Sequence, residues 1–534
     1  MSFDRRSFLK TSMLFSAAGM GLFPKQSVMA RDFISNDVFS KGPIETLKEF
    51  KGSHEFTGDH DTAGHEIFWD KEGFLKKNGM IPPPTKTYDV IVIGGGMAGL
   101  CSAYNHRNEK TLLIEGHPQM GGNSRAERYE NLSMSLGAAY INIPEKNDPL
   151  DLFLNDLGLN TAFRREPIDE FSVFINGKMQ GGFWNQGEDF KKVFNKFADI
   201  YENDYPELPI YPETGNREKL NQMDLLNFKQ WIAMNLGEVH PHIMEFFHQY
   251  CWSSFCGSMD DLSAAQVVGF IASDLNGVQA LPGGNAVVAE AIYNKLKSSK
   301  VSMLNNSFAV NVKNTGSDVE VTYFEDQKRL ITVRAKKVVM AAPKLVTKFL
   351  IEDLAKEQHA AMHAMKYRAY LLVNVLLSKK VPSMGYDLFA LKGKIPVSER
   401  TEIEERGFCD IIFADWANHD RADQSALTLY IPQPYEGAQQ FLFSSFTYEK
   451  HRQRILNNLG PWFDKLGLTN EDVIGMRMSR YGHALPLARQ GFIASGLVEK
   501  AHKTIDNAIF FAHSDNWANP CLETAFYSAK AAFI

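Results

Sequence analysis

Continuous apolar runs along the chain predict several buried strands. Residues 86–93 end in four consecutive β-branched residues, and residues 111–114, 338–342 and 507–512 hold shorter runs of the same kind. Strands that helices cover on both faces have such unbroken apolar runs, whereas strands with one wet face alternate between apolar and polar residues. The pattern therefore predicts an α/β fold built on a parallel sheet.

The N-terminal segment has the order of a targeting peptide. Arg5-Arg6 and the following Ser-Phe-Leu-Lys precede an apolar stretch over residues 13–23 and a small-residue cleavage site at residues 28–30. The arginine pair resembles the twin-arginine signal of proteins exported in the folded state. An ordinary secretory signal is the alternative, but the apolar stretch is weak. We expect a signal peptide over residues 1–30, the twin-arginine export machinery as a partner, and a periplasmic or secreted protein.

Length and charge narrow the remaining classes. The chain has 534 residues, more than the roughly 250–300 at which a single core stops growing, so we expect two or more lobes. The net charge of -6, with basic residues spread along the chain, provides no patch for nucleic acid. Past the N-terminus, no apolar run reaches the roughly 18 residues that cross a bilayer. We expect neither a nucleic-acid partner nor an integral membrane domain.

The cysteines and histidines do not form a metal-binding pattern. The five cysteines lack metal-type spacing, and we expect buried thiols, with pairing of Cys251 and Cys256 left open. His54, His60 and His65 are irregularly spaced and favour a solvated arm. We therefore predict no metal site.

A glycine turn follows the first predicted strand directly. In GxGxxG, Gly94 permits a tight turn, Gly96 lets the backbone approach a pyrophosphate, and Gly99 lets the next helix pack closely. The N-terminus of that helix, with Met97 and Ala98, then faces the phosphates. The strand at 111–114 ends at Glu115, about 20 residues on, where a carboxylate binds ribose hydroxyls. Together these features predict a dinucleotide-binding domain.

A second glycine pair favours FAD over NAD. The segment Met120–Arg125 places two glycines before polar and basic residues just after the acidic strand, and it resembles the flavin amine oxidase and desaturase superfamily. The resemblance implies a two-dinucleotide-binding-domain flavoprotein with FAD as cofactor and an inserted α+β substrate domain. Its contacts from this turn would be Gly121, Gly122, Asn123 and Ser124.

Other segments are similar to the same superfamily and imply further FAD contacts. Residues 135–141 are similar to the segment beside the isoalloxazine ring, and residues 307–312 to the strand that meets the adenine. Near the C-terminus, an acidic residue would bind the ribityl chain or pyrophosphate, and the next helix would point its N-terminus at the flavin. The implied contacts are Gly137, Ala138, Ala309, Asp515, Leu522, Glu523 and Thr524.

Within the superfamily, the chain is most similar to bacterial spermidine dehydrogenase-like proteins. This resemblance depends on residues 52–54, 250–258, 262–264, 282–285 and 512–515. One departure is that many amine oxidases hold a water near flavin N5 with a lysine, and the strand at residues 367–374 has none. The electron acceptor is therefore left open between oxygen and a periplasmic carrier.

The candidate catalytic residues are aromatic and polar. A dry aromatic site favours the neutral amine, which can release hydride to the flavin. His483 precedes the last FAD segment and is the preferred polar candidate, with a structural histidine as the alternative. An aromatic wall would come from Trp252, Phe255, Tyr481, Trp517 and Phe526, each of which could instead be core.

Acidic residues near an entrance would collect a cationic amine. Asp260, Asp261 and Glu523 are candidates, although acidic side chains are usually solvated surface.

The FAD domain is expected from residues 87–150, 275–350 and 488–534. Residues 31–86 would be an irregular arm, and residues 151–274 and 351–487 the substrate domain, with helical stretches such as Leu220–Asn235 and Glu357–Met365. The site should lie between the domains.

The resemblance implies an FAD-dependent oxidoreductase that oxidises an amine, polyamine-like, by hydride transfer to flavin N5, giving an imine that hydrolyses. Two alternatives remain: a carotenoid-type desaturase or oxidase of an apolar substrate, and a non-catalytic flavin-binding redox module.

Overall fold

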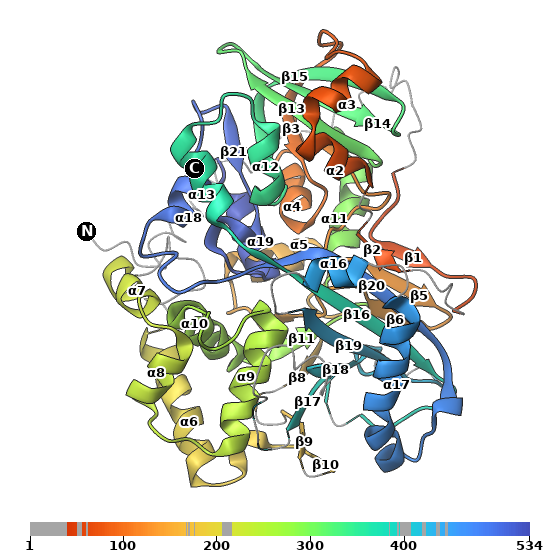
Figure 1. Cartoon of the computed structure of the whole chain (residues 1–534), viewed down its shortest axis with the longest axis vertical. Coiled ribbons are helices and arrows are strands. Elements are labelled where there is room, and N and C mark those ends of the chain that lie inside the picture. The colour runs from red at the N-terminus through yellow and green to blue at the C-terminus, as the bar shows by residue number, and fades with distance from the viewer. Residues whose placement is uncertain are drawn as a thin grey trace, which may run out of the picture.

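The apolar run at residues 86–93 forms the central strand of the upper domain in Figure 1. This computed structural model describes residues 40–533 except 51–55, 60–61, 167, 169–170, 176, 205–215, 384, 392, 394, 396–406, 419–422, 434–437 and 444–446. The predicted signal peptide and His54, His60 and Asp61 lie outside the described residues.

The central strand belongs to a seven-stranded mixed sheet in the described part of the chain. β3 (Thr87–Ile93) pairs in parallel with β4 (Thr111–Ile114) and with β15 (Arg329–Met340). The order is β12 (Val301–Leu304), β4, β3, β15, β14 (Val319–Glu325) and β13 (Ser307–Asn314), with β21 (Ile509–Phe511) also paired to β15. The predicted α/β fold is thus confirmed.

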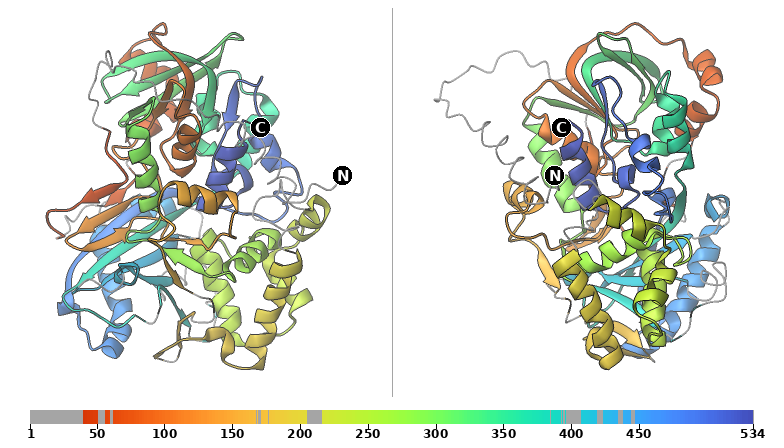
Figure 2. Two further views of the ribbon diagram at one scale, coloured as in Figure 1. Left: turned by 180° about the vertical axis from the view of Figure 1, so that it is seen from behind. Right: turned by 90° about the vertical axis from the view of Figure 1, so that its left-hand side faces the viewer.

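Helices cover both faces of this sheet, which explains the unbroken apolar runs. Val90 and Val92 share a core with α4 (Met97–Asn105), α11 (Ala286–Lys297) and α19 (Leu522–Ala531). Ile91 and Ile93 face the opposite core, with α13 (Lys356–Ala364) and α18 (Leu497–Ala501). The left view of Figure 2, in which the molecule is seen from behind, shows helices packed on this sheet.

The lower domain is built on an eight-stranded sheet within the described residues. Its two longest strands, β16 (Tyr367–Leu377) and β20 (Val473–Pro486), are antiparallel neighbours. The order is β10 (Lys178–Gln180), β9 (Val173–Ile175), β17 (Asp387–Leu391), β18 (Asp410–Phe413), β19 (Ala426–Gln433), β16, β20 and β2 (Thr57–Gly58).

The two sides of this sheet have different neighbours. On one side, Leu371, Val373 and Val375 share a core with residues of α17 (Thr447–Leu466). On the other side lies a helical lobe of α6 (Glu188–Asp199), α7 (Arg217–Asp224), α8 (Phe228–Asn235), α9 (Pro241–Phe255) and α10 (Ala264–Asp274). Figure 2 shows α17 and this lobe on opposite sides of the sheet.

The stretch Leu220–Asn235 is not one helix. α7 ends at Asp224, and Asn227 caps α8 by accepting from the Gln230 amide at 2.8 Å while the Gln230 side chain accepts from the Asn227 amide. Asparagine prefers this capping role to a helix interior, so the chain restarts there. The predicted helix at 357–365 agrees with α13.

The N-terminal arm is more regular than predicted. β1 (Ile44–Thr46) pairs in parallel with β5 (Ala126–Tyr129), which pairs with β6 (Leu132–Ser135), and β2 extends the lower sheet beside β20. α2 (Thr62–Trp69) and α3 (Lys71–Asn78) bury Ile67 and Phe74 against β13 and β14. The apolar residues of the arm are spaced for only two short helices. The sequence therefore did not indicate that the arm is this regular.

A small sheet lies where the two domains meet. β11 (Val278–Ala280) pairs antiparallel with both β7 (Tyr140–Asn142) and β8 (Arg164–Glu166). The upper-domain strands come from residues 87–150, 275–350 and 488–534, the segments proposed for the FAD domain. In the described part of the chain, no helix has the length and apolarity required to cross a membrane.

Candidate functional site

The first glycine turn is closed by backbone packing. Gly94 has a φ of +111°, and a Cβ there would lie 2.6 Å from the Ala341 carbonyl oxygen. A Cβ on Gly99 would overlap the Gly94 carbonyl oxygen, so α4 can approach β3 only with glycine at this position. Gly96 is the N-cap of α4 without a side-chain hydrogen bond, which leaves the first helical amides, including those of Met97 and Ala98, free to meet phosphate.

The second glycine turn packs directly on the first. The Gly121 amide donates to the Gly95 carbonyl at 2.8 Å, and a Cβ on Gly122 would lie 2.9 Å from the Gly96 Cα. Two side-chain-free turns thus present adjacent backbone surfaces. Asn123 is exposed and donates from Nδ2 to the Ala484 carbonyl at 3.1 Å, while Ser124 is buried. This arrangement fits the diphosphate of a dinucleotide.

Glu115 lies where a ribose ligand is expected. Its carboxylate accepts from the Gly95 and His117 amides, each at 2.6 Å, which leaves further lone pairs for hydroxyl groups. Burial raises the pKa of Glu115, and these amides and Arg125 oppose that shift. The Ser307 amide donates to the Glu115 carbonyl at 2.9 Å, so Ala309 on β13 lies two residues from this point. The two roles stay predictions.

The segment Ser135–Tyr140 is held from the lower domain by side-chain donors. Asn374 Nδ2 donates to the Ser135 carbonyl at 3.1 Å, and Tyr481 donates to the Leu136 carbonyl. The carbonyls of Gly137 and Ala139 accept from Tyr430 and Tyr386.

We call the four donors the clamp: Asn374, Tyr386, Tyr430 and Tyr481. The second glycine turn lies against the segment that the clamp holds. The Ala138 amide donates to the Asn123 carbonyl at 3.0 Å, and a Cβ on Gly137 would overlap that same oxygen. Gly137 and Ala138 are therefore fixed between the phosphate turns and the lower sheet, where a flavin ring would be oriented. The sequence did not indicate these four contacts, because three of the donors lie on β16, β19 and β20 and the fourth, Tyr386, directly precedes β17.

Asp515 is part of a buried ion pair. Its Oδ1 accepts from Lys344 Nζ at 2.7 Å, and its Oδ2 accepts from the Lys344 amide at 2.7 Å and from the Tyr367 hydroxyl at 2.6 Å. Burial alone would raise the pKa of Asp515, but His513 and Lys344 hold it far below its usual range. A ribityl or pyrophosphate contact would require this network to open, so it stays a prediction. Lys344 was not singled out from the sequence.

The turn at Leu522–Thr524 begins α19, as predicted. Cys521 caps this helix by accepting from the Thr524 amide, and Leu522 packs in the core shared with α4. Glu523 is buried, and its Oε1 accepts from the Asn142 amide at 3.0 Å. It is therefore not an entrance carboxylate. Asp260 is also excluded from that role, because it is an exposed partner of Lys229 at 3.1 Å. Asp261 bonds Ser258 at 3.0 Å.

Two of the three catalytic candidates lie in the packed interior, and their catalytic roles stay predictions. Trp252 has no exposed surface and donates from Nε1 to His248 Nε2 at 3.0 Å, so it is core. Tyr481 is buried and its hydroxyl belongs to the clamp. The other aromatic candidates, Phe255, Trp517 and Phe526, are buried in the cores as well.

His483 differs, because its side chain is exposed beside Tyr367, with ring centroids 6.4 Å apart. The surrounding protein lowers the pKa of His483 by desolvation, against the opposing effect of Asp59. A neutral imidazole that directly precedes Ala484, the residue whose carbonyl accepts from Asn123, is thus available as a polar contact, and its role stays a prediction.

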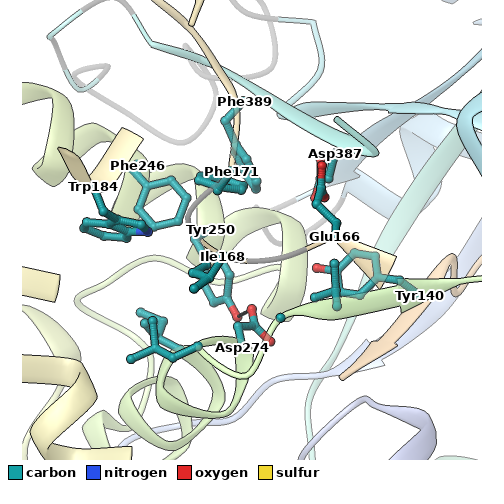
Figure 3. Close-up of a pocket in the computed structure, with 14 residues that line it drawn as sticks. Tyr140, Glu166, Ile168, Phe171, Trp184, Phe246, Tyr250, Asp274, Asp387 and Phe389 are labelled. Carbon is teal, nitrogen blue, oxygen red and sulfur yellow. Dashed lines mark hydrogen bonds between the residues drawn. The ribbon is translucent and has the colours of Figure 1, made fainter. Parts of the chain in front are cut away.

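A cavity between the lower sheet, the helical lobe and the small sheet combines aromatic rings with carboxyl groups. Figure 3 shows Asp387 beside Glu166, and Asp274 beside Tyr250. About 590 Å³ of space that no protein atom fills, including the open solvent at the mouth, lies among the lining residues. The rings are those of Tyr140, Phe171, Trp184, Phe246, Tyr250 and Phe389.

The carboxyl groups of this cavity are strongly perturbed. Burial raises the pKa of Asp274 to about 7, and burial together with the neighbouring carboxyls raises that of Asp387 well above its usual range. Perturbed acids in a cleft are candidates for function. Tyr140 connects the cavity to the clamped segment, because it directly follows Ala139. The sequence did not mark these acids, since they stand singly in β8, α10 and β17.

The cysteines form no disulfide, and the described residues form no metal-binding cluster. Cys251 and Cys256 are buried and are not joined by a disulfide, and Cys256 Sγ donates to the Ala369 carbonyl at 3.4 Å. No cluster of three or more metal-binding side chains occurs among the residues that the structure describes.

Comparison with known proteins places these features in context. Residues 97–532 match the family model described as flavin containing amine oxidoreductase. Oxidoreductase PigB of Serratia sp. (strain ATCC 39006) is 23% identical over 504 residues, covering 83% of this chain and 74% of PigB.

Two solved structures share the fold. Wild-type putrescine oxidase bound to putrescine has a TM-score of 0.59 at 16% identity, covering 84% of this chain and 99% of that one. A CLA-producing fatty acid isomerase from P. acnes also has a TM-score of 0.59, at 15% identity, covering 83% and 97%.

Proposed function

We propose, from the premise that this chain belongs to the flavin containing amine oxidoreductase family, that it oxidises a polyamine-like amine to an imine that hydrolyses. The chain is an FAD-dependent oxidoreductase by its family. Bound FAD supplies the acceptor, flavin N5, to which the amine's α-carbon would transfer a hydride. The polyamine-like substrate and the resemblance to spermidine dehydrogenase-like proteins are part of the proposal.

The residues present fit FAD and divide its binding among three sites. The two glycine turns would hold the diphosphate, Glu115 the adenosine ribose, and the clamped residues Gly137 and Ala138 one side of the flavin ring. Each of these groups is fixed by hydrogen bonds or close backbone packing within the protein. The cofactor would therefore meet a preorganised surface.

The observation that carries the amine proposal is the pairing of carboxyl groups with aromatic rings in one cavity. Asp274, Asp387 and Glu166 would attract a cationic amine, because opposite charges in a poorly solvated site interact strongly. The ring-lined wall would exclude water and disfavour the charged form of the nitrogen next to the reacting carbon. Both properties are required of a site that collects an ammonium ion and oxidises it as the neutral amine.

An apolar substrate is the second candidate. Phe171, Trp184 and Phe246 form an apolar wall that would suit a hydrocarbon chain. The fatty acid isomerase of the same fold is named for an apolar substrate. The buried carboxyl groups argue against this candidate, because a hydrocarbon would leave them without compensation.

Export and electron transfer extend the proposal. We propose that residues 1–30 direct the folded, FAD-loaded protein through the twin-arginine pathway to the periplasm or outside. Electrons would pass to oxygen or to a periplasmic carrier. Exchange of Arg5 and Arg6 for lysine should retain the protein in the cytoplasm, which cell fractionation would measure.

Anaerobic titration of the purified holoenzyme tests the proposed function. Putrescine, spermidine, aromatic amines and amino acids would each be added while the oxidised flavin band is followed. Bleaching by an amine supports the proposal. Bleaching by unsaturated hydrocarbons or fatty acids alone would favour the second candidate, and a flavin that no compound bleaches would indicate a redox module without catalysis.

A further inference from the structure

Three carboxyl groups meet near the ring-lined cavity: Asp387 and Glu166 line it, and Asp410 lies next to them on the neighbouring strand. In the register of the lower sheet, Asp410 lies opposite Phe389, and Asp387 lies two residues before Phe389 on the same strand. Asp387, Phe389 and Asp410 therefore point to the same face, because side chains alternate along a strand. Glu166 on β8 approaches this face beside Asp387.

The carboxylates of this cluster lack full compensation. Asp387 and Asp410 are 5% and 2% exposed, and the Oδ1 atom of each has no hydrogen-bond partner in the described part of the chain. Asp387 and Glu166 both line the cavity, so these two acidic residues form part of its wall. The side chains of Asp387 and Asp410 hydrogen-bond to each other, and Asp410 also bonds Ser253. A buried carboxyl oxygen that still lacks a partner is costly, and a ligand that completes it would explain its presence.

The neighbours of the cluster add negative charge. Asp410 and Glu166 both raise the pKa of Asp387, and Asp387 and Asp274 both raise that of Tyr140.

A nitrogen that keeps its charge suits this cluster better than the nitrogen that reacts. The reacting nitrogen must be neutral to release hydride from its α-carbon, whereas adjacent carboxylates stabilise an ammonium ion. We propose that Asp387, Asp410 and Glu166 form a subsite for a second ammonium group of the substrate, which is then a diamine or polyamine. This inference rests on the proposed amine oxidation and adds the residues that select its substrate class.

Binding at the subsite should release protons. In the free protein, burial and the neighbouring carboxyls raise the pKa of Asp387, and burial raises the pKa of Asp410 to about 7, so both shifts favour the protonated forms. An entering ammonium ion favours the ionised forms. The ammonium group keeps its own protons, and the protons lost by the carboxyl groups pass to the buffer. An ordinary exposed acid would show no such exchange.

Calorimetry with tert-butylammonium tests the subsite without turnover, because this cation has no hydrogen on its α-carbon. Titrated into the oxidised holoenzyme in phosphate and in Tris, it should bind with a heat that differs between the buffers. The neutral tert-butanol should bind far more weakly. Asp387→Asn and Glu166→Gln should each lower the affinity for tert-butylammonium by about 30-fold or more.

Asp260→Asn is the matched control, because Asp260 is exposed and paired with Lys229 on the surface. It should bind tert-butylammonium as the native protein does. Retained flavin absorbance and an unchanged melting temperature would show that each variant is folded. Equal affinity of the Asp387→Asn and Glu166→Gln variants for the cation, or equal binding of the alcohol, would overturn the subsite.

The substrate class is tested by comparing diamines with monoamines of equal chain length in anaerobic flavin reduction. The diamine should reach half-saturation at a lower concentration, and Asp387→Asn should abolish that advantage. An advantage that survives in Asp387→Asn would refute the assignment while leaving amine oxidation intact. Cation binding that depends on Asp387, in an enzyme that no amine reduces, would refute the proposed function alone.

Discussion

The cofactor cradle, which consists of the two glycine turns and α4, and the ring-lined cavity are built in opposite ways. The cradle is mostly backbone: Gly94, Gly99 and Gly122 bring two turns and a helix so close that no side chain fits. The cavity is made of side chains, with single acids such as Glu166, Asp274 and Asp387 supplied by separate elements. Backbone geometry can recognise a common cofactor, whereas scattered side chains can adapt to one substrate. The comparison predicts which changes remove the flavin and which alter its substrate.

The largest effect should come from breaking the cradle at Gly99. The Cβ that Gly99→Ala adds would overlap the Gly94 carbonyl oxygen. We therefore expect the variant to lose FAD and most of its soluble yield. The measurement is the ratio of flavin to protein absorbance after purification.

Gly460→Ala is the matched control, since Gly460 is also helical and its Cβ would meet nothing within 4 Å. It should retain FAD and gain up to about 1 kcal/mol of stability. Full flavin content in Gly99→Ala would contradict the backbone account of the cradle.

The next effect concerns the ion pair beside the predicted flavin segments. Lys344→Met would leave Asp515 buried without its cation, which costs about 3–5 kcal/mol of unfolding free energy. Denaturant unfolding would measure the loss. Lys313→Met, at the exposed pair with Glu352, should change little. A Lys344→Met variant as stable as the native protein would show that the pair is dispensable.

Asp274 in the cavity should make the free energy of unfolding depend on pH. Burial raises the pKa of Asp274 to about 7, so the folded protein binds a proton there that the unfolded chain releases near pH 4. This contribution is full below about pH 4 and is lost as pH rises towards 7, by about 1.4 kcal/mol per pH unit.

Asp274→Asn removes that loss, so its stability relative to the native protein should increase between pH 5 and 7. Unfolding of the two proteins at several pH values provides the measurement, with Asp260→Asn as the control. A constant difference across this range would contradict a buried, protonated Asp274.

The smallest effect should come from the clamp that joins the two regions. Tyr481→Phe removes one hydroxyl from the Leu136 carbonyl and should cost about 1 kcal/mol. The flavin should remain bound with altered fluorescence if the clamped segment orients it. Tyr88→Phe on β3 is a control remote from the clamp. Unchanged stability and fluorescence in Tyr481→Phe would argue against the clamp.

The cradle could be predicted from the sequence because its signals are local. The apolar strand, Gly94 to Gly99 and Glu115 lie within some thirty residues, and each has a fixed geometric reason. The fold followed from the same apolar runs. The break between α7 and α8 was missed, because a capping asparagine was taken as part of one periodic stretch.

The cavity could not be predicted, because its residues are adjacent only after strands pair. Asp387 and Asp410 meet through the register of β17 and β18, which no local pattern specifies. Conversely, the ring types of Trp252 and Tyr481 indicate an aromatic wall, and the structure shows that both rings are buried and that the Tyr481 hydroxyl belongs to the clamp. Aromatic residues are frequent in both cores and sites, so residue type alone does not separate the two.

The most direct test of hydride transfer in this site compares an amine with the same amine deuterated at its α-carbon. Anaerobic reduction of the holoenzyme flavin would be followed in a rapid-mixing instrument at saturating amine. We expect bleaching of the oxidised band at a rate that deuterium clearly slows, because the C–H bond breaks as the flavin is reduced. Equal rates for the two amines, or an amine that binds without bleaching the flavin, would contradict the account.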